Sequence, residues 1–129
     1  MKSEKKRADE LFSLAIVGSI GRCENSPCRS NQRGVLTPAH ILNRWHDRVR
    51  CDTRNAFCLC FECHRWFEDH PPEFNEFVSE SHLAIYLPTL IAKSNVTLCQ
   101  KTDWGERIEF LTDIVVGLKT LKQARLEEV

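Results

Sequence analysis

Residues 39–64 read AHILNRWHDRVRCDTRNAFCLCFECH, and this stretch carries most of the residues that point to a fold and a function. It contains a histidine–asparagine–histidine series, formed by His40, Asn55 and His64. His64 directly follows the second cysteine of a Cys60-x-x-Cys63 pair. A polar series that ends on a cysteine pair is typical of a small metal-binding domain, so a second pair of ligands is expected elsewhere in the chain.

That second pair lies upstream, in the polar turn GRCENSPC that contains Cys23 and Cys28. Their spacing is within the range of zinc ligands that share one turn. We expect both pairs to bind one zinc ion tetrahedrally, through Cys23, Cys28, Cys60 and Cys63. A closed shell of four thiolates leaves no position for a reacting water, so this zinc is structural. Cys58 is close enough to replace Cys60, although the two-residue spacer favours Cys60 with Cys63.

The cysteine count and the start of the chain bear on its compartment. The chain has 129 residues, which suits one domain small enough to gain from a metal. It has seven cysteines but opens MKSEKKRADE without an apolar signal segment, and no stretch approaches transmembrane length. We therefore expect a reducing cytoplasm, no membrane contact, and cysteines that bind metal. Cys51 and Cys99 are left over, and we expect them to pack as small apolar residues.

The chain resembles the HNH endonuclease family, in particular its members with a four-cysteine structural zinc. The resemblance lies in the combination of CxxxxC, AHI, Asn55, LCxxCH and HP-x-EF. The resemblance covers roughly residues 8–80. Compact phage-encoded and bacterial proteins have a similar layout, which implies a phage or mobile-element origin and a bacterial or phage-infected cell. The resemblance also implies a ββα-metal fold that hydrolyses DNA phosphodiester bonds with Mg²⁺ or another divalent ion.

The resemblance implies a role for each of the three polar residues. His40 corresponds to the general base that takes a proton from water. Asn55 corresponds to the residue that holds the loop and orients this histidine. His64 corresponds to a ligand of the catalytic divalent ion, placed near the start of a helix.

One position departs from the commonest family pattern. The residue before the general base is often Asp or His and binds the metal, whereas this chain has Ala39. Glu68 lies one helical turn beyond His64 and is the expected substitute ligand. Asp69 and His70 are weaker candidates because prolines follow them. Alternatively, water and DNA phosphate complete the coordination shell of a magnesium ion without a further protein ligand.

Basic residues are concentrated around the motif. The whole chain has zero net charge, but residues 22–65 contain eight arginines, no lysine and four acidic residues. This segment therefore carries +4 and the remainder −4. Because a planar guanidinium can bond two phosphate oxygens at once, we expect this segment to face DNA. The expected contacts are Arg44, Arg48, Arg50, Arg54 and Arg65, with His46 as a weaker candidate.

Residue patterns predict an α+β fold whose zinc-bound core has flanking N- and C-terminal helices. Residues 1–7 are charged and expected to be disordered, residues 8–80 form the core with its leading helix, and residues 81–129 form a helical extension of the same domain. The predicted core elements are a helix at 8–19, strands at 35–42 and 55–59, a helix that starts at His64, and a helix that starts at Pro71.

The C-terminal part is less uniform. Residues 83–99 are ambiguous between helix and extended structure, with Pro88 interrupting them. Asp103 is expected to cap a long amphipathic helix that runs to about Glu127. This helix either folds back on the domain or pairs with a second copy of the chain.

These features together predict a metal-dependent HNH endonuclease that nicks DNA or cuts both strands. The alternative is a non-catalytic zinc module that binds nucleic acid or protein. Such a module needs the four cysteines and the arginines but not His40, and Ala39 keeps this alternative open.

Overall fold

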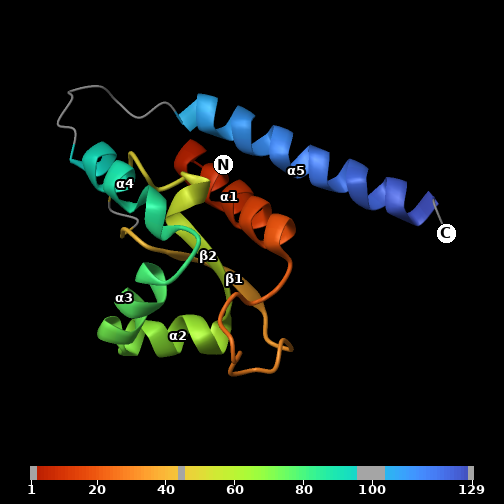
Figure 1. Cartoon of the computed structure of the whole chain (residues 1–129). Coiled ribbons are helices and arrows are strands. Elements are labelled where there is room, and N and C mark those ends of the chain that lie inside the picture. The colour runs from red at the N-terminus through yellow and green to blue at the C-terminus, as the bar shows by residue number, and fades with distance from the viewer. Residues whose placement is uncertain (1–2, 44–45, 96–103, 128–129) are drawn as a thin grey trace.

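Two short antiparallel strands occupy the centre of the structure (Figure 1). The computed structural model describes residues 3–43, 46–95 and 104–127. In it, β1 (Leu36–His40) pairs with β2 (Ala56–Cys60), so that Leu36 lies opposite Cys60. Both predicted strands are therefore present, within two residues of their predicted bounds. Because the described sheet has two strands, both are edge strands, and Pro38 is tolerated in β1.

α2 (Phe61–Asp69) follows β2 without a connecting loop. It begins three residues before the predicted start at His64. The Cys60 sulfur accepts a hydrogen bond from the backbone N–H of Cys63, 3.4 Å away, and so caps the first turn. Cys63 and His64 therefore lie on the first turns of a helix whose start is joined to the strand.

α1 (Glu4–Ile20) packs against the sheet. The Ser3 hydroxyl accepts a hydrogen bond from the backbone N–H of Lys6, so the helix begins four residues earlier than predicted. Residues 4–7, for which the sequence predicted a disordered start, are the first residues of this helix. The helix ends at Gly21, whose φ of 71° lies in the left-handed region that glycine adopts readily.

β2 is buried along its whole length because it is covered on both faces. Phe57 and Leu59 face a cluster that α2 and α3 (Pro71–Ser79) help to build. Ala56 and Cys58 point the opposite way, into a cluster with α1 and α5 (Trp104–Glu127). Cys58 therefore packs as an apolar residue beneath α1.

Residues 84–94, which belong to the range 83–99 that was ambiguous in sequence, are helical. The short 3₁₀ helix η2 (Ala84–Tyr86) runs into α4 (Leu87–Ser94), where Pro88 occupies the first turn and needs no hydrogen-bond partner for its nitrogen. The expected cap Asp103 and the spare Cys99 lie outside the described residues.

α5 lies along α1, which is one of the two arrangements expected for it (Figure 1). Leu111 is fully buried between the helices and the sheet. The two helices approach closely at Gly18, where a Cβ atom would lie 2.9 Å from the Leu118 side chain. None of the helices in the described ranges combines the length and the apolar run that a membrane span requires.

Candidate functional site

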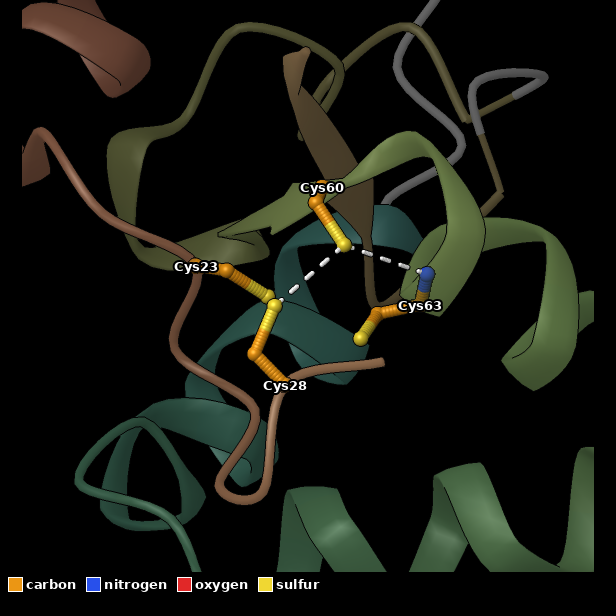
Figure 2. Close-up of side chains that lie close together, drawn as sticks. All are labelled: Cys23, Cys28, Cys60 and Cys63. Atoms are coloured by element: carbon orange, nitrogen blue, oxygen red, sulfur yellow. Dashed lines mark hydrogen bonds between the residues drawn. The ribbon is translucent and has the colours of Figure 1, made fainter. Parts of the chain in front are cut away.

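Four cysteines converge at the junction between the α1–β1 loop and the β2–α2 corner (Figure 2). Their sulfur atoms all lie within 4.8 Å of one another, and the sulfurs of Cys28 and Cys60 are 3.6 Å apart. Four sulfurs at about 2.3 Å from a tetrahedral zinc are about 3.8 Å apart, so the cluster has the right size for this ion. The set is the predicted one, formed by Cys23, Cys28, Cys60 and Cys63.

The surroundings of the cluster also suit thiolates. The backbone N–H of Arg29 and the side-chain amide of Asn25 donate to the Cys63 sulfur, at 3.2 and 3.3 Å. The hydrogen bond with the Ser30 hydroxyl lowers the pKa of the Cys28 thiol to about 6. Such donors stabilise the negative charge that four thiolates bring to one site.

Burial acts in the opposite direction on another ligand. It raises the pKa of the Cys23 thiol to about 12, so this group keeps its proton near neutral pH while no metal is bound. A metal that binds here must displace that proton. Affinity for zinc is therefore expected to fall as the pH falls.

His40, the last residue of β1, is held by the loop between the strands. Its Nε2 atom lies 2.9 Å from the backbone carbonyl oxygen of Arg50. Because a carbonyl can only accept a hydrogen bond, Nε2 carries the proton. In the neutral ring the lone pair is then on Nδ1, which is the atom able to accept a proton. The His40 ring also stacks on the ring of Phe12 from α1, with centroids 5.1 Å apart.

Asn55 is fully buried and connects both ends of that loop. Its side-chain amide donates to the carbonyl oxygens of Leu42 and Val49, each at 3.1 Å. Its side-chain oxygen accepts from the backbone N–H of Leu42 at 2.7 Å. Three hydrogen bonds with one buried side chain hold Leu42 and Val49 in place, and Val49 directly precedes the residue that binds His40.

His64 is oriented by a different partner. Its Nδ1 lies 2.9 Å from the Thr37 hydroxyl, and that hydroxyl donates its single proton to the Leu59 carbonyl oxygen at 3.0 Å. The hydroxyl can therefore only accept from His64, so Nδ1 carries the proton and the lone pair of the neutral ring is on Nε2. The two histidines are thus held in opposite tautomers.

The Nε2 atom of His64 lies 3.0 Å from a carboxylate oxygen of Glu68. A nitrogen lone pair and a carboxylate repel each other at this distance unless positive charge is shared between them. Two ligands at right angles around one ion, each at about 2.1 Å, are about 3.0 Å apart, so the pair fits a divalent cation. A proton on Nε2 fits the same distance as an ion pair.

One pocket of about 710 Å³ contains both histidines and Glu68. Ala39 is part of its apolar lining and supplies no ligand atom. Neither of the two weaker ligand candidates lines the pocket, because Asp69 points to solvent and His70 stacks on Trp66. Within the described ranges, the four cysteines are the one group of three or more candidate ligands that converge.

Two of the five arginines expected at DNA are bound to carboxylates of the chain itself. Arg50 donates two hydrogen bonds to Asp9 of α1, and Arg54 donates two to Asp52. Burial alone would raise the pKa of Asp52, but the bonds from Arg54 and Lys93 outweigh it and hold that pKa well below its usual range. These two guanidinium groups therefore have structural partners.

The other expected contacts differ in their surroundings. Arg65 is exposed on α2, next to His64 in the chain, and Arg48 is half-buried in the loop. His46 is exposed, and Arg44 lies outside the described residues. Residues that line or shape the pocket and were not predicted include Asp9, Phe12 and Thr37. No motif spacing in the sequence connects these three residues with the histidines, so sequence patterns could not identify them.

A scan of the chain against protein-family models finds no match, and searches of curated proteins and of solved structures find none either.

Proposed function

We propose that the chain is a metal-dependent endonuclease of the HNH type, with β1, β2 and α2 as its ββα-metal core. The observation that carries this proposal is one pocket in which His40 is hydrogen-bonded through Nε2 and His64 through Nδ1, an arrangement that assigns opposite tautomers to the two neutral rings. A base needs a lone pair directed at water, and a metal ligand needs one directed at an ion. Two histidines fixed in different tautomers suit these two different roles.

In the proposed reaction, a water oxygen attacks phosphorus while Nδ1 of His40 takes its proton, and the bond from phosphorus to the leaving oxygen breaks. A divalent cation held by His64 and Glu68 would supply positive charge where negative charge develops on the phosphate and the leaving oxygen. Asn55 keeps the loop in the conformation that directs His40. The four-thiolate zinc stays structural and takes no part in the chemistry.

DNA is the proposed substrate, because residues 22–65 carry a net charge of +4 and Arg65 is exposed on the helix that carries His64. Contacts of this kind bind the phosphate backbone with little dependence on base sequence. A reducing cytoplasm is the proposed compartment, since zinc binding requires the cysteines to stay reduced.

The direct test is incubation of zinc-loaded protein with supercoiled plasmid in Mg²⁺, Mn²⁺, Co²⁺ or Ni²⁺, with EDTA as the control. We expect nicked or linear product in at least one of these ions and none in EDTA. Intact plasmid in all four ions, with folded protein that contains zinc, would rule out the proposed activity.

The alternative function is a non-catalytic zinc module that binds nucleic acid or protein. It is favoured by Ala39 and by the fact that, among the described residues, no third ligand converges with His64 and Glu68 to hold a second metal. The two functions differ in one measurement. A binding module retards labelled DNA on a gel without cleaving it in any divalent ion, and replacing His40 leaves that retardation unchanged.

Thr37→Val should weaken binding of the divalent cation by about 10- to 100-fold, because the outer partner of a metal-binding histidine sets its tautomer. Valine keeps the shape of threonine and suits a strand but offers His64 no acceptor. Calorimetric titration with Mn²⁺ measures the affinity, and Thr37→Ser, which keeps the hydroxyl, is the matched control. If Thr37→Val binds Mn²⁺ as tightly as the wild type while Glu68→Ala does not, the tautomer assignment is wrong.

A further inference from the structure

We propose that α1 belongs to the catalytic apparatus, because Asp9 and Phe12 hold the His40 ring in the orientation and tautomer that a base requires. Neither side chain is expected to touch the substrate, so both are positioning residues. The inference rests on the proposed role of His40, and its test separates a failure of one from a failure of the other.

Asp9 is linked to His40 through one residue, Arg50. The Arg50 guanidinium donates to both carboxylate oxygens of Asp9, at 2.7 and 2.5 Å, and the pair is largely shielded from solvent. Its bond with Asp9 also raises the pKa of Arg50. A bidentate pair of this kind restricts distance and angle together. The backbone carbonyl of the same arginine accepts the hydrogen bond from His40 Nε2.

The carbonyl of Arg50 is therefore fixed from two directions. Asn55 binds the preceding carbonyl, that of Val49, from inside the loop. Asp9 binds the Arg50 side chain from α1. Without Asp9, the partly buried guanidinium of Arg50 would lose the carboxylate that accepts two of its hydrogen bonds, and it would gain by moving toward water. Such a movement would shift the adjoining carbonyl and release the proton on His40 Nε2 from its acceptor.

Phe12 restricts the ring itself. Its side chain is 2% exposed, and its ring is inclined by 29° to the His40 ring. Because Phe12 is packed in the cluster beneath α1, it cannot move aside to let the imidazole rotate. α1 thus fixes the plane of the ring through Phe12 and its proton through Asp9 and Arg50.

A second ion pair between α1 and the same loop offers a matched comparison. Lys5 lies 3.2 Å from Asp47, and both side chains are more than two-fifths exposed. Breaking this pair by replacing Lys5 leaves the bonds from Arg50 to Asp9 and from His40 to the Arg50 carbonyl in place, so it tests attachment of the loop to α1 alone. Exposed pairs also contribute little to stability.

The test measures plasmid cleavage and the ¹⁵N shifts of the His40 ring in full-length, zinc-loaded protein. Asp9→Ala is expected to lower kcat by about 10- to 100-fold with KM little changed, because the base is displaced rather than removed. Arg50→Ala should lower kcat by the same factor. The double variant should lose no more than either single one, since both changes break the same link. Lys5→Ala should match the wild type.

The ring nitrogens give a readout that does not depend on activity. In the wild type we expect the proton of neutral His40 on Nε2, and in Asp9→Ala a mixture of both tautomers. Asp9→Asn is the second variant if Asp9→Ala does not fold. Wild-type ¹⁵N shifts and kcat in the folded Asp9 variant would overturn the inference, and so would an equal loss in Lys5→Ala. If the wild type cleaves no DNA, the proposed function fails, and the shifts still decide whether Asp9 positions the ring.

Discussion

His40→Ala is expected to lower kcat for plasmid cleavage by about 10²–10⁴-fold, which is the usual contribution of a general base. The side chain occupies the end of β1 and is half-buried, so its loss removes the proton acceptor without opening the core. Zinc content and far-UV circular dichroism should match those of the wild type, because the four cysteines lie outside the pocket. Affinity for Mn²⁺ should also be unchanged.

His64→Ala should impair metal binding rather than proton transfer, because His64 is the proposed metal ligand and His40 is the proposed base. We expect weaker Mn²⁺ binding in calorimetry and partial recovery of cleavage at high metal concentration through Glu68. His82→Ala is the matched control, since His82 is an exposed histidine outside the pocket. A fully active His40→Ala protein would remove the proposed mechanism. Unchanged Mn²⁺ affinity in both His64→Ala and Glu68→Ala would remove the proposed metal site.

Cys60→Ser is expected to abolish zinc binding and unfold the domain. Binding of structural zinc is worth about 10–16 kcal/mol at neutral pH, which is as large as the whole stability of a typical domain at about 5–15 kcal/mol. Cys60 also caps α2 and joins that helix to β2, so its loss disturbs two elements at once. Elemental analysis and thermal unfolding followed by circular dichroism measure the two effects.

The matched control is Cys58→Ala, two residues away on the same strand. Cys58 is equally buried but packs beneath α1, and it is not one of the four converging cysteines. We expect this variant to bind one zinc per chain and to unfold at a temperature only slightly below that of the wild type. Folded Cys60→Ser protein with wild-type melting and no zinc would show that the metal does not hold the fold.

The four converging cysteines and the α+β element order were predictable from sequence because both depend on short-range spacing. Two residues between Cys60 and Cys63 place their sulfurs on one helical turn, and the Cys23 turn has a similar constraint. Side-chain alternation and turn residues predicted both strands, and apolar periodicity predicted α5. Local geometry decides these features, so local sequence is enough to find them.

Helix starts were predicted less well, because a single capping contact moves them. Ser3 extends α1 toward the N-terminus, and the sulfur of Cys60 starts α2 three residues before His64. Cysteine is not among the common capping residues, so sequence rules gave no reason to begin α2 there. The sequence left α4 ambiguous because a proline breaks a helix at interior positions but is tolerated in its first turn, where Pro88 lies.

The sequence by itself determined which four cysteines converge, the order of the elements and the two histidines that line the pocket. Only the tertiary structure decided how those histidines are held. Thr37 of β1 contacts His64 of α2, and Phe12 of α1 contacts His40 of β1. The count of arginines likewise concealed that Arg50 is bound to Asp9. Such contacts join residues far apart in the chain, and no local spacing encodes them, because packing of the whole domain brings them together.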